Sequence, residues 1–68
     1  DTQEDSILQL VMSLPRKYRM VLYLHYYEGY STAEIAKLLR CPTGTVKSRL
    51  NRARNALRKK LSDKRELF

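Results

Sequence analysis

The sequence predicts an all-α fold of four short helices, in which the last two form a C-terminal helix-turn-helix without a wing. Two observations lead to this fold class. Apolar residues recur at helical rather than alternating spacing along the chain. Only two glycines and two prolines interrupt the 68 residues, and each stands near an expected helix boundary. We therefore expect one small domain over residues 1–68, with short connections and a thin core.

The first two helices are predicted from an apolar stripe and two punctuating residues. Residues 5–14 carry apolar side chains at helical spacing and should form the first helix. Pro15 suits the first position of a second helix, because the N–H that proline lacks is not needed there. The second helix should extend to about Glu28, and Gly29 is well placed to end it.

A capping box and a proline bound the third helix. Ser31 and Glu34 have the spacing at which each side chain can bond the other's backbone N–H, so a helix should cover about residues 32–39. Its inward-facing side chains are expected to be Ile35, Ala36, Leu38 and Leu39. Pro42 disfavours helix at the residue before it. The fourth helix should therefore begin near Thr43 and continue to about Leu61.

The third and fourth helices, with the short turn between them, have the pattern of a helix-turn-helix over about residues 31–61. Ala36 is small where the two helices would cross closely. Val46, ten residues later, would fill the space between them. The predicted packing residues of this motif are Ile35, Ala36, Leu39, Val46 and Leu50.

The fourth helix has an apolar stripe on one side and polar residues on the other. At about 100° per residue, the buried stripe should comprise Val46, Leu50, Ala53, Leu57 and Leu61. The opposite side carries Gly44, Ser48, Asn51 and Asn55. Lys47 and Arg58 flank that side on one edge, and Arg52 and Lys59 flank it on the other. Donor side chains and small residues together suit the reading of base edges in a major groove.

The charge of the chain is concentrated in this helix. The formal net charge is +7, yet acidic and basic residues balance within residues 1–42 and again within residues 62–68. Residues 43–61 therefore carry the whole net charge and contain no acidic residue. A solvated surface helix normally mixes charges of both signs. The concentration instead indicates a surface that binds a polyanion such as nucleic acid.

Other functional classes find little support in the sequence. No nucleophile, carboxylate pair or cluster of metal ligands accompanies His25 or the single cysteine, Cys41, so we expect neither an enzyme nor a metal or other cofactor. No apolar run is long enough to span a bilayer. We expect most of the five tyrosines to pack in or beside the core. The alternatives are a platform for stacking single-stranded bases and a protein-docking surface.

The strings CPTGTVKSRLNRAR, STAEIAKLL and LPRKYRMVLYLHYYEGYS together resemble region 4 of bacterial sigma factors, and the extracytoplasmic-function (ECF) type is the nearest match. The resemblance covers about residues 14–61. It implies a sigma region 4 fold, like a winged helix without the wing, that reads the −35 promoter element and directs RNA polymerase to promoters. By position in the family motif, Lys47, Ser48, Asn51 and Arg52 match base-reading residues. Thr32, Thr45, Arg49 and Arg54 match phosphate-contacting residues.

The resemblance also implies the partners and the setting. Double-stranded promoter DNA, the flap of the RNA polymerase core β subunit and an anti-sigma factor are the expected partners, in the bacterial cytoplasm and without membrane insertion. The chain begins with Asp rather than Met, and we expect it to be a piece of a longer sigma factor. Arg40 departs from helix-turn-helix sequences that place glycine in the turn.

Two alternative functions remain open at this point. One is the helix-turn-helix output domain of a response-regulator-type transcription factor, although such domains usually lack the SRLNRAR continuation. The other is a protein-interaction module whose basic helix binds an acidic partner.

Overall fold

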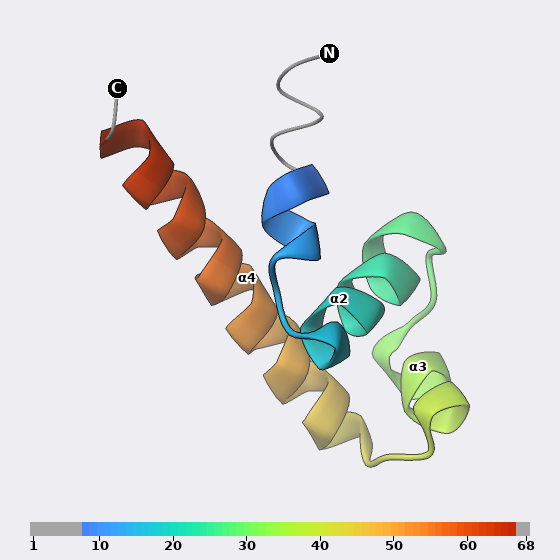
Figure 1. Ribbon diagram of the computed structural model, residues 1–68. Helices are drawn as coiled ribbons and strands as arrows, with labels where there is room; N and C mark the ends of the chain where they lie inside the picture. Colours follow the sequence, from blue (N-terminus) through green and yellow to red (C-terminus); the bar gives the residue numbers. More distant parts are fainter. Residues whose placement is uncertain (1–7, 67–68) are drawn as a thin grey trace.

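The computed structural model describes the backbone of residues 8–66 and the side chains of residues 8–63. All of the regular structure in this part of the chain is helical, which confirms the predicted all-α class. In chain order, residues 8–12 are helical, α2 (Arg16–Leu22) continues directly into η1 (Tyr23–Tyr27), and α3 (Thr32–Leu39) and α4 (Thr43–Glu66) follow (Figure 1). Counting α2 and η1 as one continuous helix gives four helices within residues 8–66.

The first helix ends earlier than predicted. It stops at residue 12, and its predicted start lies outside the described residues. A tight turn follows, in which the Leu14 N–H donates to the Val11 carbonyl at 3.0 Å and the Leu14 side chain enters the core. Pro15 is the cap that precedes α2 rather than its first residue, because its ψ of 148° is extended. Its carbonyl still accepts the first helical bond, from the Arg19 N–H at 3.1 Å.

The second helix widens before it ends, which the sequence pattern did not predict. Within η1 the Glu28 N–H donates to the Tyr23 carbonyl at 3.1 Å, a bond that spans five residues as in a π-helix. Gly29 then adopts a φ of 81°, which confirms its predicted role in ending the helix. After the glycine, the Tyr30 N–H donates a hydrogen bond to the Leu24 carbonyl at 3.0 Å and so satisfies a carbonyl at the end of the helix.

The capping box at the start of α3 is present as predicted. The Ser31 N–H donates to Glu34 Oε1 at 2.9 Å, and the Glu34 N–H donates to Ser31 Oγ at 3.1 Å. The prediction that Leu38 faces inward is wrong, because that side chain is 56% exposed. Leu38 lies about 100° of helical rotation from the centre of the packed stripe of α3, and no second layer covers it.

Helix α4 is the longest element, and α2 and α3 both pack against it (Figure 1). It extends to Glu66, beyond the predicted end near Leu61. Val46, Leu50 and Ala53 are buried, and Leu57 is half-buried. The prediction that Leu61 continues this stripe is wrong, because Leu61 is 41% exposed. Leu57 packs against the core cluster, whereas Leu61, one turn later, is not among the side chains that do.

The core is small and apolar. Within residues 8–63 no polar or charged side chain is buried. The buried residues come from the turn before α2 and from α2, α3 and α4, and are Leu14, Val21, Leu22, Ile35, Ala36, Val46, Leu50 and Ala53. No helix within residues 8–66 is both long enough and apolar enough to cross a membrane.

Candidate nucleic-acid interface

The N-terminal half of α4 is held by its apolar side, which turns its polar side outward. Val46 is fully buried and Leu50 is 2% exposed, and both belong to one cluster with Ile35 and Ala36 of α3. Leu39 is half-buried against the same cluster. Because apolar residues recur with the helical period, the residues between them must face solvent.

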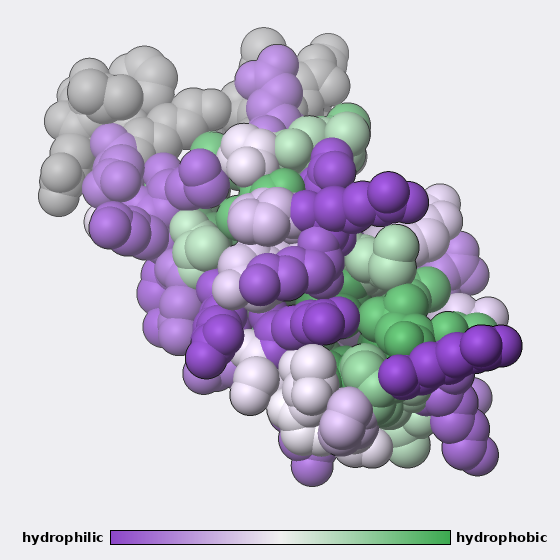
Figure 2. All heavy atoms as spheres, turned by 60° about the horizontal axis from the view of Figure 1, so that its bottom comes forward, coloured by the Kyte–Doolittle hydropathy of each residue, from purple (hydrophilic) through white to green (hydrophobic). Residues whose placement is uncertain are grey.

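All four residues that match base-reading positions are on this outward side. The side chains of Lys47, Ser48, Asn51 and Arg52 are each exposed. Gly44 lies on the same side one turn earlier, and a Cβ atom placed on it would meet no atom within 4 Å beyond the neighbouring residues and backbone of its own helix. Figure 2 shows hydrophilic side chains over much of the surface at this end of the molecule. The first three turns of α4 thus present donors and one very small residue to an incoming ligand.

The residues that match phosphate-contacting positions differ in their exposure to solvent and in where they lie on the fold. Thr32, Thr45 and Arg49 are half-buried, whereas Arg54 is exposed. Arg54 lies on the opposite flank of α4 from Arg49, and its Nη1 donates a hydrogen bond to the hydroxyl of Tyr26. This placement gives Arg54 a partner within the protein.

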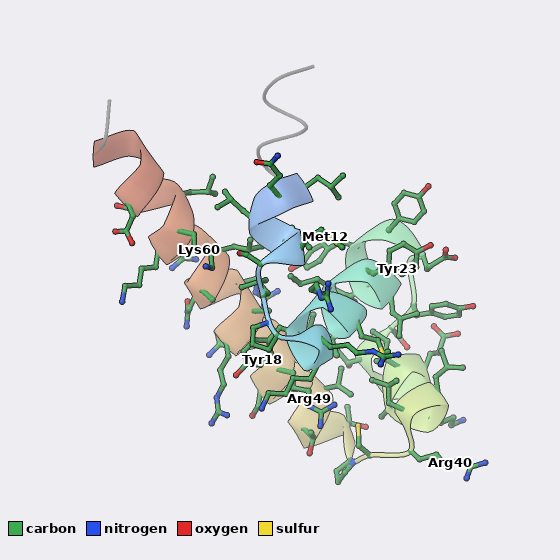
Figure 3. All side chains as sticks on the ribbon, viewed as in Figure 1. Met12, Tyr18, Tyr23, Arg40, Arg49 and Lys60 are labelled. Carbon is green, nitrogen blue, oxygen red and sulfur yellow. The ribbon has the colours of Figure 1, made fainter. Side chains whose placement is uncertain are left out.

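A polar cleft lies between α2 and α4 on the flank that carries Arg49. Its volume is about 390 Å³. The lining residues are Lys17, Tyr18, Gly44, Thr45, Ser48, Arg49 and Arg52. Figure 3 shows Tyr18 and Arg49 near each other where α2 crosses α4. The cleft therefore joins residues of the outward side of α4 to two residues of α2.

Sequence reasoning did not identify Lys17 and Tyr18 as interface residues. The charges of residues 1–42 sum to zero, so Lys17 disappears in the average over that block. In the structure, Lys17 Nζ lies 5.3 Å from the centre of the neighbouring Tyr18 ring, within the range of a cation–π contact. Tyr18 is half-buried and packs against the core cluster, whereas Lys17 is exposed.

An apolar groove lies on the other flank of α4. Its volume is about 470 Å³, and it is lined by Val11, Leu22, Tyr23, Tyr26, Tyr27, Arg54 and Leu57. The expectation that most tyrosines are packed in or beside the core is wrong. Only Tyr18 is half-buried, while Tyr23, Tyr26, Tyr27 and Tyr30 are exposed, from 37% to 77%.

The widened turn of η1 arranges the tyrosines at this groove. The rings of Tyr23 and Tyr27 stack with their centres 5.0 Å apart. The Tyr23 hydroxyl donates to Glu28 Oε1 at 2.9 Å, and this bond to the carboxylate raises the pKa of Tyr23 above its ordinary value of 10.0. Sequence reasoning could not separate this patch from core packing, because helical spacing is the same in both cases.

The turn between α3 and α4 contains the one described non-glycine residue with a positive φ. Arg40 adopts the left-handed conformation, with φ 55° and ψ 50°. The Cys41 N–H donates to the Ala36 carbonyl at 3.0 Å and so satisfies a carbonyl at the end of α3. The turn thus has the shape that glycine normally provides, although arginine occupies the position.

The remaining chemically active side chains have ordinary surroundings. His25 is half-buried, and its Nδ1 lies 2.9 Å from the Tyr30 carbonyl oxygen, so this nitrogen carries a proton and donates it. Cys41 is a half-buried free thiol. Among the described residues, His, Cys, Asp and Glu form no group of three or more that could hold a metal ion.

Comparison with known proteins places these features in one family. The family model described as sigma-70, region 4 matches residues 4–57. The chain is 48% identical over 59 residues to the ECF RNA polymerase sigma factor SigW of Bacillus subtilis, covering 87% of this chain and 32% of that protein. It is 43% identical over 61 residues to the RNA polymerase sigma-H factor of Pseudomonas aeruginosa, covering 90% and 32%.

A third relative is the ECF RNA polymerase sigma-E factor of Escherichia coli K12, at 42% identity over 55 residues and with 81% of this chain and 29% of that protein covered. The chain therefore spans about a third of the length of these curated relatives.

Proposed function

Because the chain belongs to the sigma-70 region 4 family and matches its ECF members, we propose that it recognises the −35 promoter element for an ECF-type sigma factor. In this role it directs RNA polymerase to promoters at the start of transcription. The observation that carries the proposal is the outward side of α4. Lys47, Ser48, Asn51 and Arg52 are all exposed on the helix whose other side fixes the core.

In the proposed complex, α4 lies in the major groove with its N-terminal turns toward the bases. Lys47 and Arg52 can donate to guanine, and Asn51 can donate to and accept from adenine. Gly44 has no side chain to hold the helix away from the groove edge. These residues determine which sequence is preferred, and contacts to the DNA backbone supply most of the affinity and its dependence on salt.

The phosphate contacts are assigned to the edges of the same surface. Thr32, Thr45 and Arg49 keep the role that the family motif suggests. The structure gives less support to Arg54, because its guanidinium group donates to Tyr26 beside the apolar groove. We therefore use Arg49 as the test residue for a backbone contact.

The division between base-reading and backbone residues predicts two different mutant phenotypes. Arg52→Ala should relax the preference at one or two base pairs, at about 1–3 kcal/mol, because the base contact that distinguishes those pairs is lost. Arg49→Ala should weaken binding to all duplexes alike, because phosphates are the same in every sequence. Affinities for a library of −35-like duplexes, measured by fluorescence anisotropy, check both. Uniform loss in both variants would show that the roles are wrongly assigned.

A comparison of ligands tests the function itself. Duplexes of −35-like and random sequence are titrated at two salt concentrations, with heparin as a polyanion of unrelated structure. Preference for the −35-like duplex at both salt concentrations is expected. Equal binding to all three ligands would overturn promoter recognition and favour a basic module that binds acidic proteins.

The apolar groove is the exposed apolar surface that would suit a protein partner. We propose that the flap of the RNA polymerase β subunit docks there, and that an anti-sigma factor competes for the same surface. Supporting this, Tyr26 is 58% exposed and Tyr27 is 77% exposed, with Leu57 beside them in the groove.

Substitution at the groove separates docking from DNA binding. Tyr27→Ser should lower the affinity of the chain for purified core polymerase, because it removes exposed apolar area from the proposed contact, while duplex affinity stays unchanged. Leu38→Ser is the matched control, since Leu38 is 56% exposed on α3 and does not line the groove. Equal polymerase affinity of both variants would place the docking surface elsewhere.

A further inference from the structure

The polar cleft between α2 and α4 has the composition of an anion site. Its lining residues include three cations, Lys17, Arg49 and Arg52, and no carboxylate. Tyr18, Thr45 and Ser48 add hydroxyl groups, and Gly44 leaves room for the ligand. Every lining side chain that is polar can therefore donate a hydrogen bond to a phosphate oxygen.

The position of the cleft relates it to the surface that reads bases. Ser48 and Arg52 line the cleft and also belong to the exposed polar side of α4. A duplex seated on that side would bring its sugar–phosphate backbone to the edge of α4, where the cleft opens. This location favours a phosphodiester group of the duplex over a free anion. The reason is that Ser48 and Arg52 face both the cleft and the side of α4 on which the duplex would lie.

Lys17 reaches the cleft from outside the helix-turn-helix. It is exposed on the first turn of α2, and its ammonium group is held 5.3 Å from the centre of the Tyr18 ring. A contact from α2 and contacts from α4 would together hold the duplex at two separate elements. Two-point attachment limits rotation of α4 about its own axis within the groove, whereas contacts from α4 alone do not.

We propose that this cleft binds one backbone phosphate of the promoter duplex, and that Lys17, positioned by Tyr18, contacts it from α2. The proposal rests on the proposed function, because it needs α4 to lie against duplex DNA. It adds a residue that the helix-turn-helix pattern does not contain.

The test compares two neighbouring cations of α2. Lys17→Ala and Arg16→Ala remove the same charge, but Arg16 is exposed beside Met12 and Met20, outside the cleft. Affinities of the 68-residue chain for −35-like and random duplexes are measured over a range of salt concentrations. Circular dichroism checks that each variant retains its helices, and Lys17→Gln provides a second substitution that keeps a long side chain.

Lys17→Ala should lower affinity for every duplex by about five- to tenfold at low salt and reduce the magnitude of the salt slope by about 0.9. Arg16→Ala should change both much less. Tyr18→Phe should retain most of the affinity, because the ring still supports the ammonium group. Equal effects of Lys17→Ala and Arg16→Ala would overturn the proposed contact and indicate only a general charge effect.

Failure of the proposed function has a different signature. If the unmodified chain binds −35-like and random duplexes equally, promoter recognition fails, and the comparison of Lys17 with Arg16 still decides the phosphate contact. If the unmodified chain prefers the −35-like duplex and Lys17→Ala changes neither affinity nor slope, only the inference fails. Absence of binding to any duplex overturns both.

Discussion

Arg40 is the residue at which side-chain type and backbone conformation disagree most. Its φ of 55° is in the left-handed region, which costs a non-glycine residue roughly 1–2 kcal/mol. The sequence identified this position as a departure from helix-turn-helix patterns that have glycine. The structure shows that the turn keeps the left-handed shape with arginine in place. The helix-turn-helix therefore contains local strain that the packing of α3 on α4 must offset.

This strain predicts that Arg40→Gly stabilises the chain. Relief of the left-handed conformation outweighs the extra flexibility that glycine gives the unfolded chain, and the expected gain is about 0.5–1 kcal/mol. Urea unfolding monitored by circular dichroism measures it. Lys37→Gly is the control, because Lys37 is exposed within α3 and glycine there should destabilise by about 1 kcal/mol. A loss of stability in both variants would contradict the account of strain.

At the scale of single elements, local signals predicted both ends of α3, although the ends of the first helix and of α4 differ from the prediction. The capping box of Ser31 and Glu34 and the proline at 42 bracket α3, which runs over the predicted residues. These signals work because the atoms that form the cap are close in sequence. The widened turn η1 was not predicted, because it is defined by which backbone carbonyl each N–H selects. We have no physical account of why the chain selects it at Tyr23–Tyr27.

The capping box predicts an acid-dependent loss of stability. Two interactions with Ser31 lower the pKa of Glu34 below its ordinary value of 4.5. The larger effect comes from the hydrogen bond that the Ser31 N–H donates to the carboxylate, and the smaller from a hydrogen bond with the Ser31 side chain. Because the pKa is lower in the folded chain, the ionised carboxylate stabilises the fold above pH 4.5. That stabilisation is lost as pH falls through the folded pKa.

Stability measured from pH 6 down to pH 3 should therefore fall less steeply in Glu34→Gln than in the unmodified chain, because glutamine does not titrate. NMR titration of the Glu34 side chain provides the direct check. A midpoint at or above 4.5 would show that the cap does not favour the ionised form. Ser31→Ala should cost about 1 kcal/mol at neutral pH through loss of the same cap.

At the scale of the whole molecule, the sequence predicts which residues share a side of a helix but not what covers them. Leu61 lies on the same stripe of α4 as Leu50, yet only Leu50 has another helix over it. The same limit explains the tyrosines, which helical spacing could not assign to the core or to solvent. The cleft with Lys17 could not be predicted from the sequence either, because it forms only where α2 crosses α4. The outward position of the proposed base-reading residues could be predicted from the sequence, because it depends on one helix alone.

The difference in burial between Leu50 and Leu61 predicts that truncating them to alanine lowers the stability of the fold by different amounts. Leu50→Ala should destabilise by about 2–5 kcal/mol, because Leu50 is 2% exposed in a core of few residues. Leu61→Ala should change stability by less than about 0.5 kcal/mol, since that side chain is already 41% exposed. Thermal and urea unfolding of both variants give the comparison. Similar costs at the two positions would mean that the last turns of α4 have a packing partner in solution.

The cleft with Lys17 and the groove with the exposed tyrosines have no lining residue in common. A ligand seated in one leaves every side chain of the other unoccupied. The DNA phosphate proposed for the cleft and the protein partner proposed for the groove would therefore not compete for the same side chains. A substitution in the cleft and a substitution in the groove should also have additive effects on the free energy of a ternary assembly, because sites without shared partners usually do not couple.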